Sequence, residues 1–175
     1  MPDAHWLFGY GSLIWRPDFA YVEAQPAHLP GWERRFWQGS HDHRGTPDQP
    51  GRVVTLVEGG GCVGMAYRID GDAKGEIIER LDHREKNGYE QRNVRIDLTD
   101  GRHVEGLIYF AAPGNFAYLG DAPLDQIATQ VAASRGPSGW NYDYLYELAA
   151  ALRNLGAHDH HVFELEARVR QLRAT

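Results

Sequence analysis

The sequence predicts an α+β protein, a curled sheet or small β-barrel with helices packed around it. Apart from one helical segment, a loop-like stretch and the irregular polar segment at 40–52, the chain is strand-like as far as residue 110, whereas helical spacing dominates from residue 122 onward. Strands and helices therefore do not alternate regularly, which disfavours a parallel βαβ sheet. The length of 175 residues, 42% of them hydrophobic, is typical of one globular domain, here expected to span residues 1–175.

The predicted strands are short segments rich in β-branched and aromatic residues. The first lies in HWLFGYGSLIW and runs into a turn, and a loop-like stretch with Pro17, Pro26 and Pro30 follows it. Two hairpins are expected, one through the glycines at 59–61 and one around the sequence TDG at 99–101. The later strand segments are 34–39, 53–57, 62–69, 92–98 and 102–110.

The predicted helices show apolar residues at spacings of three and four. The first covers 75–89, with a glycine stop at Gly88. Three more occupy 122–136, 139–156 and His160 to Arg173. The turn RGPSGWN precedes the third helix, and Ser138 or Asn141 is expected to cap it.

The stretch FGYGSLIW, residues 8–15, interrupts an apolar strand with two glycines. Consecutive backbone N–H groups in a glycine-dependent conformation form a nest that suits a carboxylate or a phosphate. The alternative is a bulge or turn needed only for folding. The motif alone leaves both interpretations open, because it matches neither a Walker loop nor a dinucleotide fingerprint.

Glu85 is the candidate for proton transfer. Ile77, Ile78 and Leu81 mark the buried face of the helix predicted over 75–89, and helical spacing carries Glu85 onto that face. Burial and the negative end of the helix dipole both raise the pKa of a carboxyl group, which suits a general base near neutral pH. A structural ion pair, or fraying of the helix before this residue, is the alternative.

Other catalytic constellations receive less support. The sequences HDHRG at 41–45 and HDHH at 158–161 lack the helical spacing of a zinc site, so no metal is expected. Cys62 lies in an apolar strand and is expected to be an unreactive core thiol. Ser12 has a glycine before it but not after it, so it does not form a nucleophile elbow.

Composition restricts the partners and the compartment. A net charge of −6 argues against a nucleic-acid surface, and no apolar run is long enough to span a membrane. A secretory signal is not expected, because Asp3 and His5 lie where its apolar core would begin. One cysteine cannot form an internal disulfide, which favours the cytoplasm. No obligate protein partner is predicted.

Six blocks of the sequence carry a family resemblance when they are taken together: FGYGSLIW (8–15), RRFWQGSHDHRGTPDQPGRVVTLV (34–57), AYRI (66–69), LDHREKNGY (81–89), YLG (118–120) and GPSGWNYDYLYEL (136–148). With these blocks the sequence resembles the ChaC family of glutathione-specific γ-glutamylcyclotransferases, in the same order from residue 7 to about 155. The resemblance implies a γ-glutamylcyclotransferase-like fold, a small mixed barrel with surrounding helices. It also implies cofactor-independent cleavage of glutathione to 5-oxoproline and cysteinylglycine.

The resemblance also implies roles for individual residues. The family's catalytic glutamate corresponds to Glu85, and a tyrosine near the substrate corresponds to Tyr144. Its substrate loop corresponds to Tyr10, Gly11, Ser12 and Leu13, with Phe8 and Gly9 leading in.

Two positions depart from the family pattern. Val63 stands where a tryptophan is expected, a change expected to reshape a pocket wall, and Asn87 replaces a common glycine. The second anionic end of glutathione is expected to meet Arg44 or Arg52. Two other functions remain open at this stage, namely a non-catalytic module that binds γ-glutamyl groups and a metal-dependent amidohydrolase that uses the histidine clusters.

Overall fold

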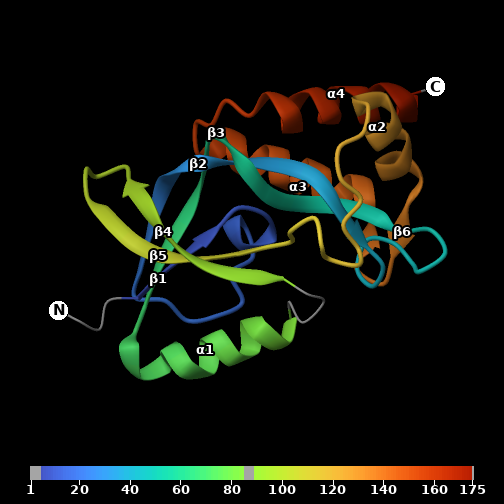
Figure 1. Ribbon diagram of the computed structural model, residues 1–175. Coiled ribbons are helices and arrows are strands. Elements are labelled where there is room, and N and C mark those ends of the chain that lie inside the picture. The colour runs from blue at the N-terminus through green and yellow to red at the C-terminus, as the bar shows by residue number, and fades with distance from the viewer. Residues whose placement is uncertain (1–4, 85–88, 175) are drawn as a thin grey trace.

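The computed structural model describes residues 5–84 and 89–174, residues 80–84 by their backbone alone. Five strands form a closed barrel, and three helices cover a long extension of two of its strands (Figure 1). The elements are β1 (His5–Gly9), η1 (Ser12–Ile14), β2 (Glu23–Ser40), β3 (Gly51–Ile69), α1 (Gly71–Arg84), β4 (Glu90–Leu98), β5 (His103–Phe110), α2 (Leu124–Ala133), β6 (Arg135–Gly136), β7 (Gly139–Trp140), α3 (Asn141–Asn154) and α4 (His160–Ala174).

The barrel has the strand order β1-β3-β2-β4-β5, and β1 closes it by pairing with β5. This closing pair is parallel, and the other four neighbouring pairs are antiparallel. Strand β1 contributes side chains to two apolar clusters, because successive side chains of a strand point to opposite faces, as Leu7 and Phe8 do. Phe8 packs with Leu29 and Ile108, whereas Leu7 packs with the residues beneath α1.

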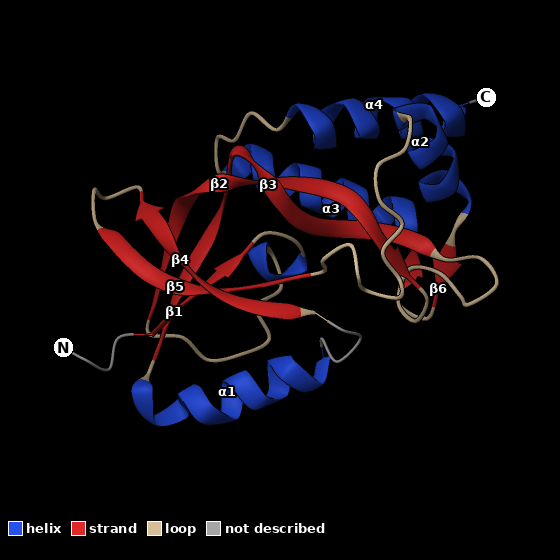
Figure 2. Ribbon diagram, viewed as in Figure 1, coloured by secondary structure: helices blue, strands red, loops and turns tan. Residues whose placement is uncertain are grey.

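The C-terminal half of β2 and the N-terminal half of β3 leave the barrel and run along the helices (Figure 2). Figure 1 shows α2, α3 and α4 gathered along this long two-stranded ribbon, whereas α1 lies at the opposite side of the barrel. Phe36 of β2 and Val54 of β3 pack in one core cluster with Leu145, Leu148 and Val169 of the helices. The molecule therefore has an apolar core in the barrel and another between the ribbon and the helices.

The predicted hairpin at Gly59–Gly61 is wrong, because β3 continues through these glycines. The β2–β3 pairing shifts register opposite them, between Pro30 and Trp32, and Gly61 has a φ of 137°. The glycines therefore accommodate an irregularity in one long ladder, and a bulge of this kind bends a strand without ending it. By contrast, the hairpin predicted around TDG is confirmed, with Gly101 at a φ of 95° between β4 and β5.

The predicted loop at Pro26 and Pro30 is also wrong, since both residues lie within β2. A proline lacks the N–H donor and is accepted where a strand has few partners or shifts register. Pro30 adjoins the register shift, and β2 pairs with β4 only at Ala27 and His28. The short strand predicted at 34–39 is thus the end of a strand of 18 residues.

The three C-terminal helices are confirmed, with their ends displaced by a few residues. Helix α1 begins at Gly71, earlier than predicted, and its predicted stop at Gly88 lies outside the described residues. Neither Ser138 nor Asn141 caps α3, because the cap residue is Trp140 and no side chain bonds there. Asn141 is instead buried and holds β3: its Oδ1 accepts from Arg52 N, and its Nδ2 donates to Arg52 O.

Candidate functional site

A pocket of about 460 Å³ lies where β1, the start of the loop after β2, and α3 meet. This volume is in the range of sites for small molecules. The lining includes seven of the eight residues that the family resemblance and the charge argument assigned to substrate binding. They are Phe8, Tyr10, Gly11, Ser12, Leu13, Arg44 and Tyr144. The pocket brings together residues as far apart in sequence as Leu7 and Tyr144, which the sequence pattern alone could not show.

Gly9, the eighth residue, does not line the pocket but allows the loop to fold. A Cβ on Gly9 would lie 2.9 Å from Leu13 Cβ, and one on Gly11 would lie 3.0 Å from the Tyr144 hydroxyl. Neither glycine has a positive φ. Close approach therefore favours glycine at both positions, and the backbone of Gly11, with a φ of −128° and a ψ of −125°, lies outside the helical and extended regions.

Hydrogen bonds hold the substrate loop from both sides. Arg34 Nε donates to the Tyr10 carbonyl at 2.7 Å, and the Tyr10 hydroxyl donates to the Tyr109 carbonyl at 2.6 Å. Further along, the Tyr67 hydroxyl donates to the Leu13 carbonyl at 2.5 Å. Burial raises the pKa of Tyr67 to about 12, so this hydroxyl remains a donor at physiological pH. The loop is therefore a fixed wall of the pocket.

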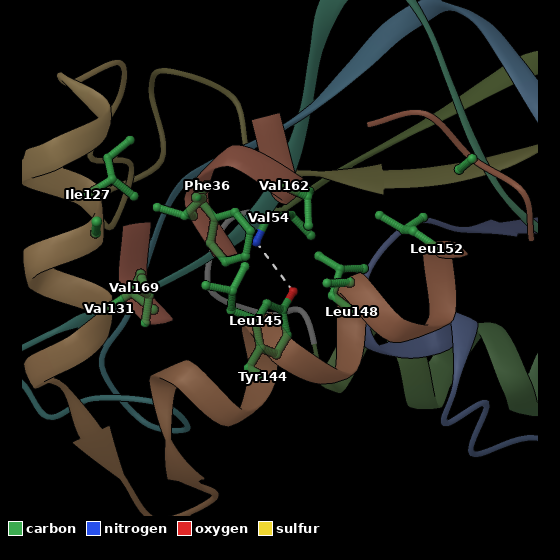
Figure 3. Close-up of a cluster of buried hydrophobic side chains, with 14 residues drawn as sticks. Phe36, Val54, Ile127, Val131, Tyr144, Leu145, Leu148, Leu152, Val162 and Val169 are labelled. Atoms are coloured by element: carbon green, nitrogen blue, oxygen red, sulfur yellow. Dashed lines mark hydrogen bonds between the residues drawn. The ribbon is translucent and has the colours of Figure 1, made fainter. Parts of the chain in front are cut away.

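Tyr144 comes from α3 and is 6% exposed. The rings of Trp15 and Phe36 contact it edge-on, with centroid distances of 5.6 and 5.9 Å. Figure 3 shows its hydroxyl directed at the backbone of Val54, whose N–H donates to it at 3.3 Å. The ring thus belongs to the helix–ribbon core, while the hydroxyl reaches the wall of the pocket beside Gly11.

Of the two arginines expected near the substrate, only Arg44 lines the pocket. Its guanidinium lies 5.7 Å from the Tyr144 ring centroid, and Nη1 donates to the Trp140 carbonyl at 3.0 Å. Arg52 instead joins elements of the fold: Nε donates to Gln130 at 2.7 Å and Nη1 donates to the Phe36 carbonyl at 2.9 Å. The expectation for Arg52 is therefore not supported.

Polar residues at the pocket mouth were not assigned from sequence. Asp18, Asp42 and His43 are exposed and line it, and His43 Nδ1 lies 3.2 Å from the Ser138 hydroxyl oxygen. Acidic and basic groups thus share the mouth, an arrangement suited to a ligand with charges of both signs. The sequence HDHRG drew attention only as a candidate metal site.

Arg34 was also missed, although the alternation of β2 contains a signal for it. Trp32, Arg34, Phe36 and Gln38 occupy one buried face, and an arginine at such a position must find partners. The departure at Val63 does not reshape the wall of the described pocket. Val63 does not line it, and the Val63 backbone carbonyl accepts from Arg34.

Glu85 and Asn87 lie outside the described residues, so the predicted role of Glu85 stays a prediction. Tyr89, which follows four positions later in the sequence, lines the pocket. Cys62 is buried, and burial raises the pKa of its thiol to about 11, as expected for an unreactive core cysteine.

The histidine clusters have structural contacts. In the segment HDHH, Asp159 pairs with Arg34 at 2.7 Å, and His161 Nε2 accepts the N–H of Phe36 at 2.9 Å. Among the residues whose side chains the structure describes, 5–79 and 89–174, no three His, Cys, Asp or Glu residues form a group that could hold a metal ion. In the same part of the chain, no helix is long and apolar enough to cross a membrane.

The model of the ChaC-like protein family matches residues 5–172. This chain belongs to that family. A human relative, glutathione-specific γ-glutamylcyclotransferase 1, is 44% identical over 169 residues, which cover 92% of this chain and 76% of the relative. An Arabidopsis thaliana relative, γ-glutamylcyclotransferase 2-3, is also 44% identical, over 97% of this chain and 90% of its own.

A crystal structure confirms the fold class. It is that of a γ-glutamyl cyclotransferase specific to glutathione from yeast, and it superposes with a TM-score of 0.89 at 30% identity. The match covers 97% of this chain and 96% of the yeast chain. The ChaC-like chain therefore has the small mixed barrel with surrounding helices that the family resemblance implied.

Proposed function

We propose that this protein cleaves glutathione to 5-oxoproline and cysteinylglycine. The observation that carries the proposal is the pocket itself. It is built by the loop from Tyr10 to Leu13 together with Arg44 and Tyr144, in a chain 44% identical to a human enzyme named for this reaction. A non-catalytic γ-glutamyl-binding module, the alternative considered above, has no comparable support, because the matching relatives are named as enzymes.

The reaction is an internal aminolysis. The α-amine of the γ-glutamyl unit attacks its own side-chain carbonyl carbon, a new C–N bond closes a five-membered ring, and the C–N bond to the cysteinyl nitrogen breaks. The attacking ammonium loses two protons as it becomes the N–H of the ring amide. The departing cysteinyl nitrogen gains one of them to leave as an amine, and the other passes to solvent or to that released amine. Holding a tethered nucleophile in the correct geometry can lower the barrier by roughly 7–11 kcal/mol. The chemistry therefore requires positioning and a single proton carrier, and no cofactor.

Glu85 is proposed as the proton carrier, removing a proton from the ammonium and delivering one to the leaving amine. The backbone N–H groups of the loop from Tyr10 to Leu13 are proposed to bind the α-carboxylate. What supports this is that the loop lines the pocket and is anchored at Tyr10 and Leu13. Fixed donors of this kind need no reorganisation when substrate binds.

Arg44 is proposed to meet the carboxylate of the cysteinylglycine end. Arg44 lines the pocket, and its guanidinium commits one nitrogen to the Trp140 carbonyl, whereas an arginine has five N–H donors. A single domain over residues 1–175 and a cytoplasmic location are part of the same proposal, the latter because glutathione keeps thiols reduced there.

The test is to incubate the purified protein with glutathione and to quantify 5-oxoproline and cysteinylglycine. We expect wild type to release both products in equal amounts and Glu85→Gln to release almost none. Glu76→Gln, which changes an exposed glutamate of α1, is the matched control and should retain full activity. Glutathione binding without turnover by wild type would overturn the proposal in favour of the binding module, and full activity of Glu85→Gln would overturn the proton-transfer role.

A further inference from the structure

A buried cation lies directly behind the substrate loop. Arg34 comes from β2, its side chain has no exposed area, and it does not line the pocket. The guanidinium donates to three acceptors: Nε to the Tyr10 carbonyl at 2.7 Å, Nη1 to Asp159 Oδ2 at 2.7 Å, and Nη2 to the Val63 carbonyl. Its planar fork thus joins three separate segments of the chain.

Asp159, the counter-ion, is itself fixed. Its Oδ1 accepts the N–H of Val162 at 3.0 Å, and its carbonyl accepts that of Phe163 at 3.0 Å, so it holds the first turn of α4. The contact from Arg34 to the loop is therefore backed by a helix and two strands. The Tyr10 carbonyl is therefore bound to a guanidinium that two further partners hold in place.

Stability alone does not account for a buried arginine at this position. Taking two charges out of water costs several kcal/mol per ion, and apolar residues of similar volume often stabilise a fold as well or better. Two side chains on the same buried face of β2 show the apolar option, since Trp32 and Phe36 pack in the cores. What an apolar side chain cannot do is bind the Tyr10 carbonyl.

The geometry of the Tyr10–Gly11 peptide links the hydrogen bond from Arg34 to the lining of the pocket. The carbonyl of Tyr10 and the N–H of Gly11 belong to one planar unit, and in a trans peptide they point in opposite directions. The described residues contain no cis peptide bond. With its carbonyl bound to Arg34, this unit directs the Gly11 N–H away from Arg34, and Gly11 lines the pocket. A cation on the carbonyl also polarises the peptide and strengthens the N–H as a donor.

We propose that Arg34 is a positioning residue that orients the Tyr10–Gly11 peptide so that the Gly11 N–H meets the α-carboxylate of the substrate. This inference rests on the proposed function, because it names how one part of the same site is held. Arg34 does not touch the substrate; it acts through the peptide that does.

Arg34→Lys tests the proposal, because lysine keeps the charge for Asp159 but lacks the fork that reaches both carbonyls. We expect the KM for glutathione to rise about tenfold or more with kcat changed less than about threefold, the pattern for a lost binding interaction. Arg35→Lys is the matched control, since Arg35 is the neighbouring, partly exposed arginine that pairs with Glu33. An unchanged KM in Arg34→Lys, or an equal rise in Arg35→Lys, would overturn the proposal.

Glu166→Gln is the control that distinguishes a loss of positioning from a general loss of stability. Glu166 is a buried carboxylate of α4 paired with Arg153 and Arg170, and none of the three lines the pocket. This variant should lower Tm and leave KM unchanged. If it raises KM as much as Arg34→Lys does, KM follows stability and the positioning role is wrong.

The wild-type protein supplies a measurement that does not depend on a variant folding. The product 5-oxoproline retains the former α-carboxylate, so adding it should shift the amide proton resonance of Gly11 downfield. Gly114, which lies in a turn outside the pocket lining, provides the control amide. Turnover of glutathione without any shift at Gly11 would overturn the positioning role. Absence of turnover would instead overturn the proposed function.

Discussion

His161 should make the stability of the protein depend on pH between neutrality and pH 4. The β2–β3 ladder shifts register between Arg35 and Gln38, and in this interval the N–H of Phe36 donates to His161 Nε2 at 2.9 Å. Only a ring whose Nε2 carries no proton can accept that bond. Burial first, and then the positive charge of Arg35, lower the pKa of His161 from 6.5 to about 4.

The size and the sign of the effect follow from these values. The folded pKa lies below the unfolded one, so the folded state favours the neutral ring and the unfolded state binds the proton more readily. The stabilisation is complete above pH 6.5 and is lost as the pH falls from 6.5 to about 4. At about 1.4 kcal/mol per unit of pKa difference, the loss amounts to about 3 kcal/mol.

Urea unfolding at a series of pH values from 7 to 4 would measure this loss. His161→Gln removes the titrating group and keeps an acceptor for Phe36 N–H. Between pH 7 and pH 4, the decrease in its free energy of unfolding should therefore be about 3 kcal/mol smaller than the decrease in wild type. His158→Gln changes an exposed histidine nearby and should follow wild type. Parallel curves for wild type and His161→Gln would refute the reasoning.

Three further predictions concern the fold and the pocket. Asn141→Ala removes both hydrogen bonds to the Arg52 backbone and should lower the free energy of unfolding, measured in urea, by about 2–4 kcal/mol. A loss below about 0.5 kcal/mol would contradict the role assigned to this side chain. Gly11→Ala places a Cβ 3.0 Å from the Tyr144 hydroxyl and should lower kcat/KM about tenfold or more, with an unchanged circular dichroism spectrum. A kcat/KM equal to that of wild type would show that the loop accommodates the added methyl group. Turnover should survive prolonged treatment with EDTA, because an internal aminolysis needs only proton transfer, and loss of turnover that zinc restores would favour the metal-dependent amidohydrolase.

The local elements could be predicted where short-range patterns decide them. The hairpin at 99–101 and the helices α2, α3 and α4 follow from turn chemistry and from apolar spacing, which act over a few residues. The hairpin predicted at Gly59–Gly61 failed for the opposite reason. Three glycines are compatible with a turn, but pairing of β3 with β2 on both sides of them stabilises one continuous strand.

The candidate site divides in the same way. The sequence by itself, through its family motifs, assigned the loop from Tyr10 to Leu13 and Tyr144 to substrate binding and Glu85 to proton transfer, and its charge argument offered Arg44 or Arg52. That the loop, Arg44 and Tyr144 line one pocket came from the tertiary structure. Only the tertiary structure decided that glycine is needed at Gly11 for close packing and that Arg34 holds the loop from behind. Both depend on contacts between segments far apart in the chain, and no spacing along a sequence specifies which distant carbonyl a buried guanidinium will bind.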